Sequence, residues 1–155
     1  MMRYAILILL LSVACFAQME QYGVMSVCTK LDGRDFCYLS PGEYHTVEMD
    51  GTMVVALGFT THRYTAVGEE KSFTNGNGTK VRFWQANDES GNRFLVHKSR
   101  DNLLISDTTG CATMKYVTGG PDMFKRLYRF EEVDSIDAQF EIIEKCHTAR
   151  KESKK

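Results

Sequence analysis

The cysteines are the residues of this chain whose spacing points to the most definite chemistry, which is disulfide formation. Four of the five cysteines follow residue 17, and four cysteines allow three pairings. Between Cys28 and Cys37 lies Asp32-Gly33, a strong signal for a two-residue hairpin turn, because both central positions of that turn take positive φ. With this turn at the tip, Cys28 faces Cys37 where the two strands come close enough for a disulfide.

We therefore predict a Cys28–Cys37 disulfide and, by elimination, a Cys111–Cys146 disulfide. The second bridge closes the longer loop and should stabilise the fold by about 3–4 kcal/mol in the chain-entropy model. In the alternative, one pair stays reduced or bridges two chains. With both bridges formed, no cysteine after residue 17 is free to act as a nucleophile.

No combination of residues matches a catalytic or metal-binding motif. The four histidines are scattered, without the two-histidine helical spacing or the Cys-x-x-Cys company of zinc sites. No serine lies in a Gly-x-Ser-x-Gly segment. Two histidines acting with a lysine, as in ribonuclease-type chemistry, need no local motif and stay an open alternative. The sequence therefore predicts a non-enzymatic protein without metal or cofactor.

A candidate binding surface centres on Trp84, the sole tryptophan. Trp84 and Phe83 point to opposite faces of a predicted strand, an arrangement that allows one of the two to be exposed. An exposed aromatic side chain near Arg82 or Arg129 would suit contact with a protein or a sugar. In the alternative, both faces of the strand are covered and both aromatic side chains are buried.

The first seventeen residues have the features of a secretory signal peptide. Arg3 precedes an apolar run over residues 4–16, which is too short to span a membrane, and Cys15 and Ala17 suit positions −3 and −1 of a cleavage site. Cleavage would leave residues 18–155 as one secreted domain with no membrane span, in a compartment where disulfides persist. Asn77-Gly-Thr is then a candidate N-glycosylation sequon in an exposed loop.

The charge of the domain gives no sign of nucleic-acid binding. Without Arg3, 18 basic residues stand against 20 acidic ones, a net charge of −2. The end of the chain, from about residue 147, is locally basic. We expect a frayed, solvated tail, with weak contact to a polyanion or an acidic membrane as the alternative.

Short strands separated by turn signals account for most of the domain. Asp50-Gly51 predicts a hairpin that pairs Val47 with Val54 and Thr46 with Val55. A short helical turn is expected around 122–127. Further strands are expected at 63–67, 80–86, 93–97, 103–106, 114–117, 127–133 and 139–146, the last with a frayed helix as the alternative.

A weak repeat suggests how these strands are arranged. Phe36, Phe83 and Phe130 recur at intervals of 47, each with an arginine shortly before it. A repeat of this size would suit a three-fold β-trefoil.

Part of the sequence resembles a family with that fold. The segments are KVRFW (80–84), RFLVH (93–97), NLLIS (102–106) and PDMFKRLYRFEEV (121–133). Over residues 81–143 the pattern is similar to interleukin-1-like and fibroblast-growth-factor-like β-trefoil cytokines, although the closing signature of the interleukin-1 family is absent. The resemblance implies an extracellular effector that acts on a protein partner, and no receptor-contact residue is carried over from it.

Together these features predict an all-β, disulfide-stabilised domain, with a β-trefoil as the leading architecture. The leading function is secreted, cytokine-like binding to a protein partner. An eight-stranded lipocalin-type barrel is the alternative architecture and would imply a carrier of a small apolar ligand. A protease inhibitor that inserts the loop between Cys28 and Cys37 is a further alternative.

Overall fold

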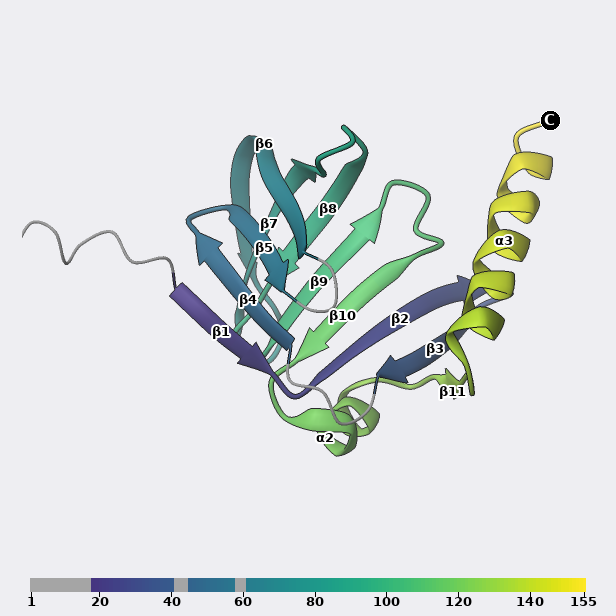
Figure 1. Ribbon diagram of the computed structural model, residues 1–155, viewed down its shortest axis with the longest axis horizontal. Coiled ribbons are helices and arrows are strands. Elements are labelled where there is room, and N and C mark those ends of the chain that lie inside the picture. The colour runs from purple at the N-terminus through teal and green to yellow at the C-terminus, as the bar shows by residue number, and fades with distance from the viewer. Residues whose placement is uncertain (1–17, 41–44, 58–60) are drawn as a thin grey trace, which may run out of the picture.

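The computed structural model describes residues 18–40, 45–57 and 61–155, so the predicted signal peptide lies outside the described residues. Within these ranges the chain is mostly strand, and its strands form one sheet (Figure 1). The strands are β1 (Gln18–Tyr22), β2 (Val24–Leu31), β3 (Arg34–Ser40), β4 (His45–Asp50), β5 (Met53–Leu57), β6 (Thr61–Thr74), β7 (Lys80–Asn87), β8 (Arg93–Lys98), β9 (Asn102–Asp107), β10 (Thr113–Val117) and β11 (Glu131–Glu132). The helices are α2 (Gly120–Leu127) and α3 (Ile136–Glu152).

The sheet follows the order of the chain over most of its width. From β4 to β10 each strand pairs antiparallel with the next, while β1 pairs with β4, and β2 pairs with both β10 and β3. The short β11 adds parallel to β3. In the described part of the chain no ladder joins the end strands β1 and β11, so the sheet is not a closed barrel. The predicted all-β character is confirmed, apart from the two helices, whereas neither the trefoil nor the barrel is.

The first hairpin has the predicted register. Asp32 and Gly33 take φ values of 52° and 74°, and Cys28 lies opposite Cys37. Both predicted disulfides are present, with Cα–Cα separations of 4.1 Å for Cys28–Cys37 and 5.7 Å for Cys111–Cys146. The local turn chemistry was therefore sufficient to fix this pairing.

The second hairpin differs from its prediction by two positions. Val47 pairs with Ala56 and Met49 with Val54, so the turn is formed by Gly51 and Thr52 instead of Asp50 and Gly51. Gly51 has a φ of 60° and stands first in the turn, which is the position that takes glycine in type II′ turns. Gly51 correctly indicated a hairpin, but placing Asp50 instead of Thr52 beside it in the turn gave the wrong strand register.

The main core lies on the inner face of the curved sheet. Its buried members come from β1 and from β4 to β10: Tyr22, Val47, Met49, Val54, Ala56, Tyr64, Trp84, Ala86, Val96, Leu103, Ile105 and Tyr116. A second cluster, around Val24, Val117 and Phe124, lies beneath α2. Tyr22 and Val24 therefore belong to different cores although only Gly23 separates them.

Gly23 is required by close packing. A Cβ built on it would lie 2.7 Å from the backbone nitrogen of Gly120, where α2 begins. Its own amide donates to the carbonyl oxygen of Val117 over 3.0 Å. Gly23 thus allows the chain to pass from β1, whose Tyr22 packs in the main core, to β2, whose Val24 packs in the second cluster.

The C-terminal helix corrects one prediction. Residues 139–146, expected as a strand, lie within α3, so the helical alternative applies, and the helix runs through Glu152. The Ser135 side chain caps the helix by accepting from the amide of Ala138, and Gln139, Ile143 and Cys146 form its buried face. The strand expected at 127–133 is limited to β11, because α2 continues to Leu127.

Figure 1 shows α3 beside the far ends of β2 and β3, where the Cys111–Cys146 disulfide joins it to the loop after β9. Among the described residues, no helix has the length and apolar character needed to cross a membrane.

Candidate functional site

The structure separates the three residues of the predicted binding surface. Trp84 is only 1% exposed, so the alternative in which it is buried applies, while Phe83 is half-buried on the other face of β7. Arg82 shares the face of Trp84, with its guanidinium carbon 5.3 Å from the centre of a Trp84 ring. Arg129 is exposed elsewhere, beside the tip of the first hairpin. Arg82 and Trp84 are therefore brought together and Arg129 is not.

Arg82 is anchored by two further groups. Its Nε and Nη2 atoms donate to the two carboxylate oxygens of Glu70 over 2.5 and 3.0 Å, and Nη2 also donates to the Gly51 carbonyl oxygen over 3.1 Å. This two-pronged bond raises the pKa of Arg82 and lowers that of Glu70. The guanidinium is held in place above the indole.

A second charged pair lies beside Arg82. In the β7–β8 ladder Arg82 pairs with Lys98, which is 8% exposed. Lys98 Nζ lies 3.3 Å from Glu20 Oε2 and donates to the Ser99 carbonyl oxygen. The Tyr22 hydroxyl also donates to Glu20, and burial, together with this bond, raises the Tyr22 pKa. Glu20 thus balances a lysine at the edge of the core.

These residues form the wall of an open cleft of about 460 Å³. The lining comes from β1, the β6–β7 turn, β7, β8 and the turn after β8: Glu20, Gly78, Thr79, Lys80, Arg82, Lys98, Ser99 and Arg100. Four cations and one carboxylate face it, which gives the cleft a positive potential. We refer to it as the charged cleft.

The turn between β6 and β7 supports one wall of the charged cleft. Asn75 accepts from the Thr79 amide at its side chain (2.9 Å) and from the Gly78 amide at its carbonyl (3.0 Å). The sequon residue Asn77 is exposed in this turn, as predicted. A glycan on Asn77 would therefore stand next to the charged cleft.

Under the charged cleft begins the apolar core. Trp84 Nε1 is buried and has no hydrogen-bond partner in the described structure. Such an unpaired donor costs about 1–3 kcal/mol. Tyr64 and Tyr116 in this core are also desolvated. Burial raises the pKa of both hydroxyls, that of Tyr64 to about 12. Arg82 therefore connects the charged cleft to the packed aromatic core behind it, where the Trp84 donor is unused.

The sequence analysis missed Glu20, Tyr22 and Lys98. Alternation did carry a signal, since Lys98 follows Phe94 and Val96 at every second position of one strand and so points to their face. Its pairing with Arg82 could have been inferred from the same hairpin. The approach of Glu20 depends on β1 and could not.

The described residues form neither a metal site nor a free cysteine nucleophile. No three histidine, cysteine or acidic side chains there gather in a way that could hold a metal ion. The cysteines there are bonded in pairs. His97 packs against Phe83 with ring centres 5.9 Å apart, and burial lowers its pKa.

Comparison with known proteins gives no relative from which a role could be transferred. No protein-family model, curated protein or solved structure matches the chain. The charged cleft itself is thus the basis on which function is inferred.

Proposed function

We propose that this protein is a secreted, non-enzymatic binding protein that carries a small apolar molecule with an anionic head group. The head group would bind at the charged cleft and the apolar part would lie toward Trp84. The observation that carries the proposal is the contact between Arg82 and Trp84, which joins a cationic entrance directly to the buried core. Ligand sites of carriers place a few polar groups beside apolar walls; here the lining of the cleft supplies the polar groups, and the apolar side chains belong to the core behind Arg82.

The charge distribution favours an anion. Arg82 and Lys98 are matched by Glu70 and Glu20, whereas Lys80 and Arg100 are exposed on the rim of the same cleft. A carboxylate, sulfate or phosphate entering there would meet an excess of positive charge. A neutral head group would gain much less.

The strand arrangement supports a lipocalin-like carrier over a trefoil cytokine. Residues 18–31 pair with β4 through β1 and with β10 through β2, so one stretch of chain links the start of the sequential series of strands to its end. Up-and-down carriers of the lipocalin type have this sequential antiparallel order. Cytokine-like activity and protease inhibition have no specific contact in their favour and stay predictions.

Fluorescence of Trp84 gives a direct test, because it is the sole tryptophan. Dodecanoate should change its emission saturably, and dodecanol, which has the same chain without the charge, should bind several-fold more weakly. The paired substitution Lys80→Gln with Arg100→Gln should weaken dodecanoate binding about threefold to tenfold. The charge-matched control, Lys71→Gln with Arg93→Gln, alters exposed cations on β6 and β8 that do not line the cleft, and it should bind normally.

Two results would contradict the proposal. One is the absence of saturable binding of any long-chain carboxylate, sulfate or phosphate by the folded protein. The other is equal affinity of the rim variant and the control, which would remove the charged cleft from the binding site.

A further inference from the structure

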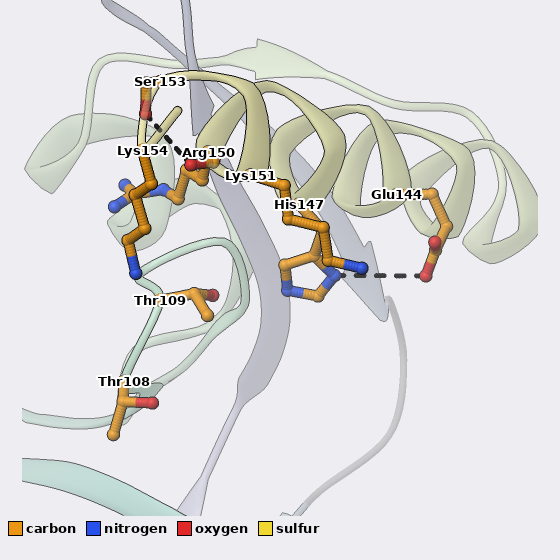
Figure 2. Close-up of a pocket in the computed structure, with 8 residues that line it drawn as sticks. All are labelled: Thr108, Thr109, Glu144, His147, Arg150, Lys151, Ser153 and Lys154. Atoms are coloured by element: carbon orange, nitrogen blue, oxygen red, sulfur yellow. Dashed lines mark hydrogen bonds and ion pairs between the residues drawn. The ribbon is translucent and has the colours of Figure 1, made fainter.

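A second cleft lies beside the Cys111–Cys146 disulfide, between the C-terminal end of α3 and the loop after β9. It has a volume of about 660 Å³, and Figure 2 shows its lining side chains. They are Thr108 and Thr109 from the loop and Glu144, His147, Arg150, Lys151, Ser153 and Lys154 from the helix and its end. We call it the basic cleft.

The two walls of the basic cleft are fixed to one another. Cys111 at the end of the loop is bonded to Cys146, one residue before His147. Gly110 takes a φ of 71°, and a Cβ there would stand 3.4 Å from Arg150 Nη2. The Arg150 guanidinium therefore lies close against the loop. This arrangement is a preformed recess with walls from two elements.

The acidic groups near the basic cleft offset part of its positive charge and leave an excess of cations. Asp107 accepts from the Thr109 hydroxyl over 2.9 Å and from the Cys111 amide over 3.1 Å, so its carboxylate is held against the loop and keeps its negative charge. It also lies 3.5 Å from His147 Nε2. Glu144 is 80% exposed and meets His147 only at 4.0 Å. The three cations Arg150, Lys151 and Lys154 still outnumber the two carboxylates, Glu144 and Asp107.

We propose that the basic cleft binds a sulfate-bearing polysaccharide. Arg150 and Lys151 lie in the last turn of α3 and Lys154 lies just beyond its C-cap, so cations from the helix and from its end line one recess, which suits successive anionic groups on a chain better than one isolated ion. Thr108 adds a hydroxyl group on the facing wall, as Figure 2 shows, whereas the Thr109 hydroxyl is bonded to Asp107. No apolar side chain is present in the lining, and an acidic membrane would require one for insertion.

The basic residues also complement the negative end of the α3 dipole, which accounts for cations in a last helical turn. That role needs no facing loop. Helix content would therefore not distinguish a role in complementing the dipole from a role in binding. Affinity for a sulfated chain does distinguish them.

The test uses the full secreted chain and a size-defined heparin fragment as the probe. Binding should weaken steadily as salt rises. The variant Arg150→Gln, Lys151→Gln, Lys154→Gln should bind on the order of 10–100 times more weakly and show a smaller salt dependence. The control Arg63→Gln, Lys71→Gln, Arg93→Gln removes the same charge from exposed strand positions and should change binding less than twofold.

Further arms separate this ligand from others of similar charge. Sodium sulfate should compete only weakly, and vesicles of phosphatidylserine and phosphatidylcholine should not retain the protein. Circular dichroism of the variant should match that of the native chain, and its dodecanoate binding should be intact. Equal loss of heparin binding in variant and control, no heparin binding at all, or retention on vesicles in its place would overturn the proposal.

Discussion

Gln139 on α3 donates a hydrogen bond from Nε2 to Thr29 Oγ1 on β2 over 2.9 Å, although 110 positions separate the two residues. Both side chains are almost completely buried. The Thr29 hydroxyl in turn donates to the Cys111 carbonyl oxygen over 2.7 Å, and Gln139 also donates to the Phe36 carbonyl oxygen over 3.1 Å. This small network joins the helix to two strands and to the loop that forms the basic cleft.

Replacing Thr29 by valine should destabilise the fold. The change keeps the shape of the side chain but leaves the buried Cys111 carbonyl without its hydroxyl donor, which costs about 1–3 kcal/mol. Urea unfolding measures the loss. Thr65→Val, at an exposed position of β6, is the control and should change stability by less than about 0.5 kcal/mol. Equal effects of the two substitutions would show that the network contributes little.

The two disulfides should differ in their contribution to stability. They close loops with sequence separations of 35 and 9 residues. The chain-entropy model then gives about 4 kcal/mol for Cys111–Cys146 and about 2.5 kcal/mol for Cys28–Cys37. Unfolding of the double serine variants checks this order, and the reverse order would show that loop-closure entropy does not decide the difference between the two bridges.

Alkaline pH should weaken the fold through the buried tyrosines. The Tyr64 pKa is about 12 in the folded chain against 10 for an exposed tyrosine, so between these values the unfolded chain loses protons that the folded chain keeps. Stability is therefore full below pH 10 and falls as pH rises through this window, by on the order of 2 kcal/mol for Tyr64 alone.

Tyr64→Phe isolates this effect. Phenylalanine keeps the ring that packs edge-on against Phe94, with centres 5.2 Å apart, and has no proton to lose. Unfolding at pH 8 and at pH 11 should show a smaller decrease for the variant than for the native chain. Parallel decreases would assign the alkaline sensitivity to other groups.

Glu20→Gln should tighten the binding of an anionic amphiphile. The substitution removes the carboxylate that lies 3.3 Å from Lys98 Nζ and so makes this lysine available to a ligand head group. We expect dodecanoate to bind about threefold to tenfold more tightly, with little change for dodecanol. The Trp84 titration measures both. Weaker dodecanoate binding in a folded variant would mean that Glu20 contacts the ligand or holds the site open.

The features that the sequence predicted well are those set by neighbours in the chain. Asp32-Gly33 fixed a hairpin and, through its register, a disulfide. The predicted strands at 80–86, 93–97 and 103–106 correspond to β7, β8 and β9, because alternation and turn signals identify short strands.

The errors arose where distant packing decides the structure. The strand expected at 139–146 is helical because its buried residues face β2 and β3 at helical spacing and Ser135 caps the start. The charged cleft requires Glu20 to meet Lys98 across the sheet. Glu20 and Lys98 are brought together by the β1–β4 and β10–β2 pairings, which join distant parts of the chain and cannot be predicted from a local sequence pattern.

The charge balance of the charged cleft rests on the edge of the sheet. Glu20 is carried by β1, whose described ladder runs along β4 alone, and Gly23 separates β1 from the ladders of β2. Edge strands with one paired side open at lower free energy than strands paired on both sides. When β1 opens, its carboxylate leaves with it and the cations remain, so thermal fraying of this strand makes the entrance more positive without any change in pH.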